Sequence, residues 1–140
     1  MVFSVPVTVR GYELDTQGHL NQAVYLQYSE HARWELLRAA GIQQNALVAS
    51  GIGPVVLEVN IKYLRELRGG DEVEVTCEPG WAEGKVFQFK QQIIKKDGTV
   101  CAEIVLVGGV MDLKARKLVS DPAAALAAVA SDPSVLGIQV

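Results

Sequence analysis

The sequence predicts an α+β fold with one long helix and an antiparallel sheet of about five strands. Residues 21–40 repeat apolar side chains at spacings of three and four, as a helix does. Residues 55–113 instead alternate apolar and polar side chains between short turns, as strands do. A helix followed by closely connected strands is typical of an α+β domain with an antiparallel meander. With 140 residues, the chain is expected to form a single domain over residues 1–140.

The N-terminal strand is predicted over residues 3–9, where valine and phenylalanine alternate with other residue types. Pro6 has no backbone N–H and cannot donate to a neighbouring strand, so this strand should lie at an edge of the sheet.

The long helix is predicted to begin after Asn21 and to end before Gly41. The Asn21 side chain can accept a hydrogen bond from a backbone N–H of the first turn, and Gly41 supplies the positive φ that commonly ends helices. Glu35 is expected to pair with Arg38 one turn later. The apolar face comprises Tyr25, Tyr28, Ala32, Leu36 and Ala39.

The remaining strands are predicted wherever apolar and polar residues alternate. These stretches are residues 55–63, 73–78, 85–95 and 99–113. A loop is expected at residues 49–54, and Asp97-Gly98 is a strong hairpin signal. Asp121-Pro122 then predicts the cap and first residue of a short C-terminal helix over residues 123–130.

Helix and sheet together suggest how the chain buries its apolar surface. The helix is apolar over much of its circumference, so a curved sheet wrapped around it would bury it best. An open sheet leaves edges exposed, and pairing with a second copy of the chain would cover one of them. We therefore expect at least a homodimer.

Composition argues against several other classes of protein. At 49% hydrophobic and 21% charged, the chain can form a substantial core, and its net charge of −3 argues against nucleic-acid binding. Cys77 and Cys101 lack the short spacing of a metal site, so we expect reduced core cysteines and no metal. The alternating first ten residues resemble neither a signal peptide nor a membrane span, which makes a cytoplasmic location the default expectation.

The stretch from residue 12 to residue 42 carries a recognisable motif. An aspartate is followed by Gly-His, a hydrophobic residue, asparagine, a polar residue and a tyrosine. The positions are Asp15, Gly18, His19, Leu20, Asn21, Gln22 and Tyr25. With residues 54–75, this stretch resembles the hotdog-fold acyl thioesterases of the 4-hydroxybenzoyl-CoA thioesterase type, particularly their acyl-ACP and acyl-CoA branch. Two positions depart from the pattern, since Gln22 replaces a common second asparagine and Glu66 a common proline.

The resemblance implies a hotdog fold, in which the curved sheet wraps around the central helix. It also implies hydrolysis of an acyl-CoA or acyl-ACP thioester to a carboxylic acid and a thiol, without a metal or redox cofactor. The expected assembly is a homodimer or a dimer of dimers.

Thioester hydrolysis needs an attacking oxygen and a place for negative charge on the carbonyl oxygen. Asp15 can act as a general base on water or attack directly as a nucleophile. A helix N-terminus suits the negative charge, and the resemblance assigns the oxyanion donor to the backbone N–H of Gln22. Without the resemblance, the spacing alone favours a simple Asx-turn for Asp15, and the resemblance reverses that preference.

The neighbouring polar residues leave alternatives open. His19 can orient a carboxylate or a water, or it can stabilise the turn. Asn21 is expected to cap the helix and so to position the oxyanion donor. Other hotdog branches place a catalytic carboxylate within the helix, where Glu30 lies, but here Glu30 is expected to pair with Arg33.

Substrate contacts are expected from the helix and from the strand at residues 55–63. Tyr25 is first a core aromatic and can also line the acyl pocket. By resemblance, Val59, Ile61 and Tyr63 would approach that pocket from a partner subunit. The basic cluster of Lys62, Arg65 and Arg68 can bind the phosphates of CoA or of a carrier-protein pantetheine arm, or it can be a solvated turn.

Two rival functions remain at the level of sequence. A hotdog dehydratase or hydratase would act on 3-hydroxyacyl or enoyl thioesters, and a binding module would hold an acyl thioester without turnover. The sequence does not select an acyl chain length, CoA over a carrier protein, or fatty-acid over polyketide metabolism.

Overall fold

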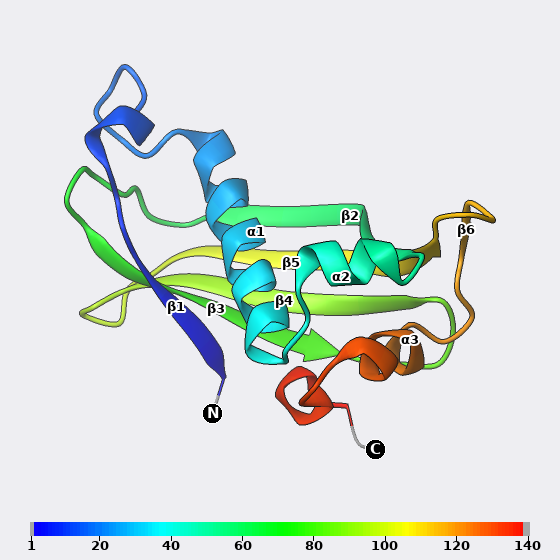
Figure 1. Ribbon diagram of the computed structural model, residues 1–140. Coiled ribbons are helices and arrows are strands. Elements are labelled where there is room, and N and C mark those ends of the chain that lie inside the picture. Colours follow the sequence, from blue (N-terminus) through cyan, green and yellow to red (C-terminus); the bar gives the residue numbers. More distant parts are fainter. Residues whose placement is uncertain (1, 139–140) are drawn as a thin grey trace. The chain divides into compact units, whose positions relative to one another are not determined.

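The computed structural model describes residues 2–138 (Figure 1). Its elements are β1 (Phe3–Thr8), α1 (Gln22–Ala39), α2 (Gln44–Ala49), β2 (Ile52–Tyr63), β3 (Glu72–Gly80), β4 (Val86–Lys95), β5 (Val100–Asp112), β6 (Lys117–Leu118) and α3 (Pro122–Val129), with 3-10 turns at Gly11–Glu13 and Pro133–Leu136. The strands pair in the order β1-β3-β4-β5-β2, and β6 pairs with β5. The α+β class is confirmed, and β1 lies at an edge, as Pro6 requires.

The segment between α1 and β2 differs from its prediction. The loop predicted at residues 49–54 is wrong in most of its length, because Ala49 is the last residue of α2 and β2 already begins at Ile52, before the predicted Val55. The turn is confined to Ser50 and Gly51, where Gly51 has a φ of 88°. A helix of six residues is too short to show a clear period, and Leu47, which is 1% exposed, anchors it in the core.

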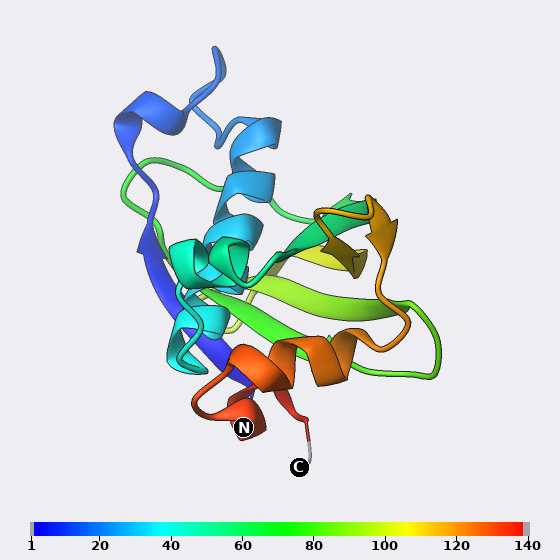
Figure 2. The same ribbon diagram turned by 45° about the vertical axis from the view of Figure 1, so that its right-hand side comes forward.

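The described chain divides into two compact units. The ribbon in Figure 2 shows the short helix α3, in orange, in the C-terminal part of the chain. Within the described residues, the first contains residues 2–34, Asn60–Glu78 and Lys90–Val105, and the second contains Glu35–Val59, Pro79–Phe89 and residues 106–138. The single domain expected over residues 1–140 stays a prediction. No helix among residues 2–138 has the length and apolar character needed to cross a membrane.

In the first unit, buried polar groups join α1 to β4. The Ser29 hydroxyl donates to Gln91 Oε1 at 2.6 Å, and Gln91 Nε2 donates to the Ser29 carbonyl at 3.0 Å. Arg33 Nη1 donates to Ser29 Oγ at 2.7 Å. The expected pair between Arg33 and Glu30 is wrong, since no such ion pair forms within the described residues and these buried acceptors bind the guanidinium instead.

The cysteines behave as expected of core residues. Cys77 and Cys101 are both free and buried. Burial raises the pKa of Cys77 to about 12, so its thiol stays protonated and unreactive at neutral pH.

In the second unit, the C-terminal segment packs through a capped helix and an aromatic contact. Asp121 Oδ1 accepts the Ala124 N–H at 3.1 Å, which confirms the predicted N-cap of α3. Trp81 Nε1 donates to the Leu136 carbonyl at 2.7 Å, and the Trp81 and Phe87 rings lie 4.9 Å apart.

Candidate active site

The loop before α1 is held by its own backbone and by one carboxylate oxygen. The Asp15 N–H donates to the His19 carbonyl at 2.7 Å. Asp15 Oδ1 accepts the N–H groups of Gln17 at 2.8 Å and His19 at 3.1 Å, so the Asx-turn is formed. Within residues 2–138, the other oxygen, Oδ2, has no hydrogen-bond partner. The carboxylate can therefore hold the turn and still offer an oxygen for chemistry.

The same hydrogen bonds set the charge of Asp15. The N–H of His19, followed by that of Gln17, holds the pKa of the Asp15 carboxyl below its usual value of 3.8. Because hydrogen bonds to the charged form favour that form, the side chain is an anion at neutral pH. The ionised Asp15 carboxylate can act either as a nucleophile or as a general base.

The start of α1 provides an unpaired donor beside this loop. Asn21 Oδ1 accepts the Ala23 N–H at 2.9 Å, which confirms Asn21 as the helix cap. The Gln22 N–H has no acceptor in the described part of the chain. It lies in the first turn of the helix, where the backbone dipoles favour negative charge.

These residues line a pocket of about 480 Å³ in the first unit. The lining consists of Asp15, His19, Leu20, Asn21, Gln22, Tyr25, Tyr63, Leu64, Arg65 and Glu66. The Tyr25 and Tyr63 rings meet edge to face at 4.9 Å, and the Tyr63 hydroxyl donates to the Gln22 carbonyl at 3.1 Å. The end of β2 is thereby attached to the first turn of α1.

Not every predicted substrate contact reaches this pocket. Tyr63 and Arg65 line it from the same chain, whereas Val59, Ile61 and Lys62 are not among its lining residues. An approach of these strand residues from a partner subunit stays a prediction.

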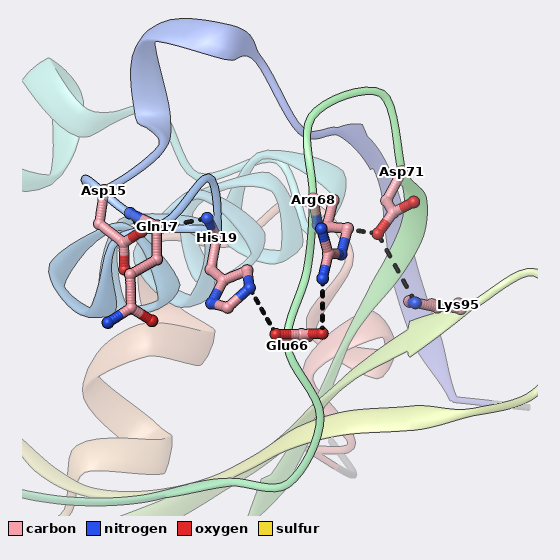
Figure 3. A network of polar contacts seen from close by, with 7 residues as sticks. All are labelled: Asp15, Gln17, His19, Glu66, Arg68, Asp71 and Lys95. Carbon is pink, nitrogen blue, oxygen red and sulfur yellow. Dashed lines mark hydrogen bonds and ion pairs between the residues drawn. The ribbon is translucent and has the colours of Figure 1, made fainter.

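A polar network continues from the pocket along the turn after β2 (Figure 3). His19 Nε2 lies 2.6 Å from Glu66 Oε2, and Arg68 Nη2 donates to Glu66 Oε1 at 3.0 Å. Asp71 Oδ2 accepts the Arg68 N–H at 2.9 Å and lies 3.6 Å from Lys95 Nζ. Arg68 is therefore paired with a carboxylate. Its expected role, as a phosphate ligand or as part of a solvated turn, stays a prediction.

Sequence reasoning missed Glu66 as a pocket residue, although its departure from the common proline was a signal. Its place depends on two segments that meet only in the fold. The Leu20 N–H donates to the Leu67 carbonyl at 2.7 Å, and His19 and Arg68 form an isolated bridge. These backbone contacts bring Glu66 beside His19.

Glu13 is a second residue that sequence reasoning missed. Its carboxylate accepts the Tyr28 hydroxyl at 2.5 Å and the Arg10 N–H at 2.9 Å, while its carbonyl accepts the Asn21 N–H at 2.9 Å. Burial acts to raise the pKa of Glu13, but the hydrogen bonds from Tyr28 and Arg10 hold it below the usual value. Burial and the Glu13 carboxylate together raise the pKa of Tyr28. Glu13 therefore anchors the loop that carries Asp15.

Comparison with known proteins gives concordant matches. The sequence profile of the thioesterase-like superfamily matches residues 9–129. The long-chain acyl-CoA thioesterase FadM of Escherichia coli is 34% identical over 112 residues, which cover 79% of this chain and 84% of FadM. The chloroplastic acyl-acyl carrier protein thioesterase ATL3 of Arabidopsis thaliana is 41% identical over 91 residues, which cover 65% of this chain and 48% of ATL3.

A solved structure agrees with these matches. The crystal structure of the E. coli protein described as YbaW probable thioesterase has a TM-score of 0.80 and 29% sequence identity to this chain. The superposition covers 90% of this chain and 97% of YbaW.

Proposed function

The chain belongs to the thioesterase-like superfamily and is a thioester hydrolase, and we propose that it hydrolyses acyl-CoA or acyl-ACP at the pocket that holds Asp15. The likeness to a solved thioesterase also confirms the hotdog fold. One observation carries the proposal. Asp15, an ionised carboxylate with one oxygen unpaired within residues 2–138, and Gln22, whose helix N-terminal N–H is also unpaired within that range, line the same pocket.

In the proposed reaction, the thioester carbonyl oxygen accepts the Gln22 N–H as negative charge develops on it. Asp15 Oδ2 either removes a proton from the attacking water or attacks the carbonyl carbon itself. In the first route, water adds to the carbonyl carbon, the C–S bond breaks, and the thiolate leaves with the proton. In the second, the Asp15 carboxylate bonds to the carbonyl carbon, the C–S bond breaks and the thiolate leaves, which gives a mixed anhydride. Water then hydrolyses the anhydride to the carboxylic acid and regenerates Asp15, and a proton from that water goes to the thiolate.

The substrate class follows from the relatives and from the walls of the pocket. FadM is named for long-chain acyl-CoA and ATL3 for acyl-ACP, and both substrates end in a pantetheine thioester. Tyr25 and Tyr63 offer aromatic surface for the acyl or pantetheine chain. Arg65 lines the pocket and has no carboxylate partner within residues 2–138, which supports a role in phosphate binding.

The proposed assembly is a homodimer or a dimer of dimers in the cytoplasm. β2 is the last strand in the pairing order, and Val56 and Leu57 on it are 51% and 50% exposed. Consecutive strand residues point to opposite faces, so both faces of this edge strand carry exposed apolar surface. A second copy of the chain would cover it.

The decisive experiment measures thiol release from a panel of acyl-CoAs and acyl-ACPs by wild type and Asp15→Asn. We expect kcat/KM to fall about a thousandfold in the variant, as for loss of a general base. Asp97→Asn is a matched control, because Asp97 Oδ1 also accepts a turn N–H, from Thr99 at 2.9 Å, but lies outside the pocket lining. Activity of a folded Asp15→Asn protein equal to wild type would contradict the proposed role of Asp15.

A further inference from the structure

Glu66 lines the pocket, yet the proposed reaction gives it no role. Both of its carboxylate oxygens are engaged, Oε2 with His19 Nε2 at 2.6 Å and Oε1 with Arg68 Nη2 at 3.0 Å (Figure 3). Arg68 is itself fixed through its backbone N–H to Asp71. Arg68 thus holds Glu66 through Oε1, and Glu66 contacts the His19 imidazole through Oε2.

This contact determines which nitrogen of His19 carries hydrogen. An ionised carboxylate can only accept hydrogen bonds, so Nε2 must be the donor. Within residues 2–138, Nδ1 has no hydrogen-bond partner, and His19 lines the pocket. Nδ1 is therefore the ring nitrogen that remains for a water or a substrate.

The neighbouring backbone keeps Glu66 and His19 together without help from the ion pair. The Leu20 N–H donates to the Leu67 carbonyl at 2.7 Å. Leu20 follows His19 in the chain and Leu67 follows Glu66, so this bond holds the two backbone segments side by side. Removing the charge of Glu66 should therefore leave the loop in place. It should change only the orientation of the His19 imidazole and the ring nitrogen that carries hydrogen.

We propose that Glu66 is a positioning residue for thioester hydrolysis. It fixes His19 with hydrogen on Nε2 and leaves Nδ1 to hold the attacking water beside Asp15, in the way that a carboxylate orients a histidine in hydrolase triads. This inference rests on the proposed function. It also assigns Arg68 to the support of Glu66.

A double-mutant cycle tests whether Glu66 acts through His19. Glu66→Gln keeps the shape and removes the charge, and we expect it to lower kcat about tenfold, as loss of a histidine's orienting partner does. In a His19→Ala background, Glu66→Gln should lower kcat by less than about twofold, because the imidazole through which Glu66 acts is already absent. KM should change little in either background, because the Glu66 carboxylate acts on the attacking water through His19 and does not bind the substrate.

Glu72→Gln is the matched control. Glu72 is also a half-exposed glutamate in an ion pair, with Lys96 at 2.5 Å, but it lies outside the pocket lining. We expect its kcat to stay at the wild-type value. An unchanged kcat in Glu66→Gln, or an equal loss with and without His19, would overturn the proposal.

A second measurement does not depend on turnover. In a proton NMR spectrum, a histidine Nε2–H bound to a carboxylate should give a downfield resonance that moves upfield in Glu66→Gln. The chain has two histidines, and His31, which is exposed on α1, serves as the internal reference. Absence of the resonance would overturn the pairing. Its presence in a protein that hydrolyses no thioester would instead contradict the proposed function.

Discussion

In Asp15, holding a turn is compatible with the catalytic role proposed for the same carboxylate. Its two oxygens are divided, since Oδ1 closes the turn and Oδ2 is unpaired within the described residues. The turn bonds also keep the carboxyl ionised by lowering its pKa. A residue that looks like a simple Asx-turn is therefore well suited to react.

Glu13 leads to a prediction about stability. Replacing Tyr28 by phenylalanine removes a donor from a carboxylate that is 9% exposed, so we expect a loss of about 1–2 kcal/mol in the free energy of unfolding. Tyr12→Phe is the control, because Tyr12 is 83% exposed and its change should cost less than about 0.5 kcal/mol. Urea unfolding at neutral pH measures both.

The same pair predicts a pH dependence. The folded-state pKa of Glu13 lies below its usual value of 4.5, so its carboxylate stabilises the fold above that pH. The stabilisation is lost as the pH falls through the lowered folded-state pKa. The penalty of Tyr28→Phe should therefore shrink in acid, and a penalty that grows in acid would contradict the role of ionised Glu13.

At the scale of elements, both ends of α1 are formed by local signals. Asn21 caps its start, and Gly41, with a φ of 81°, ends it. The Gly41 N–H binds the Arg38 carbonyl and the Ile42 N–H binds the Leu37 carbonyl, each at 2.9 Å, which is the Schellman pattern. The Asn21 cap thereby fixes the start of α1, where the proposed oxyanion donor, the Gln22 N–H, lies.

The end of α1 gives a second stability prediction. A Cβ at Gly41 would lie 1.6 Å from Ser131 Oγ and 2.8 Å from Ser131 Cβ, whereas one at Gly51 meets nothing within 4 Å. Both glycines have positive φ, so each alanine variant should lose about 1–2 kcal/mol from backbone strain. Gly41→Ala should lose about 1–3 kcal/mol more through overpacking, as measured by urea unfolding. Equal losses in the two variants would show that Ser131 moves aside freely.

At the scale of the whole molecule, the exposed edge strand predicts self-association. Leu57→Lys places a charge on β2 and should shift the protein from dimer toward monomer, which analytical ultracentrifugation measures. Val2→Lys is the matched control, because Val2 is also 50% exposed but lies next to β1, at the other end of the pairing order. An unchanged mass for Leu57→Lys would place the interface elsewhere.

The sequence by itself determined the α+β class, the ends of α1, the cap of α3 and the segment that carries Asp15 and Gln22. Each of these depends on periodicity, turn chemistry or capping among residues close together in the chain. The recognised motif added thioester hydrolysis, which the comparisons support.

Only the tertiary structure decided the rest of the pocket. Tyr63 reaches the carbonyl of Gln22 from 41 residues away, and Glu66 reaches His19 across a similar separation. It also decided that Arg33 binds buried acceptors and that residues 44–49 form α2. Local sequence patterns cannot specify such contacts. The contacts depend on which distant segments pack together and on which buried polar groups then need hydrogen-bond partners.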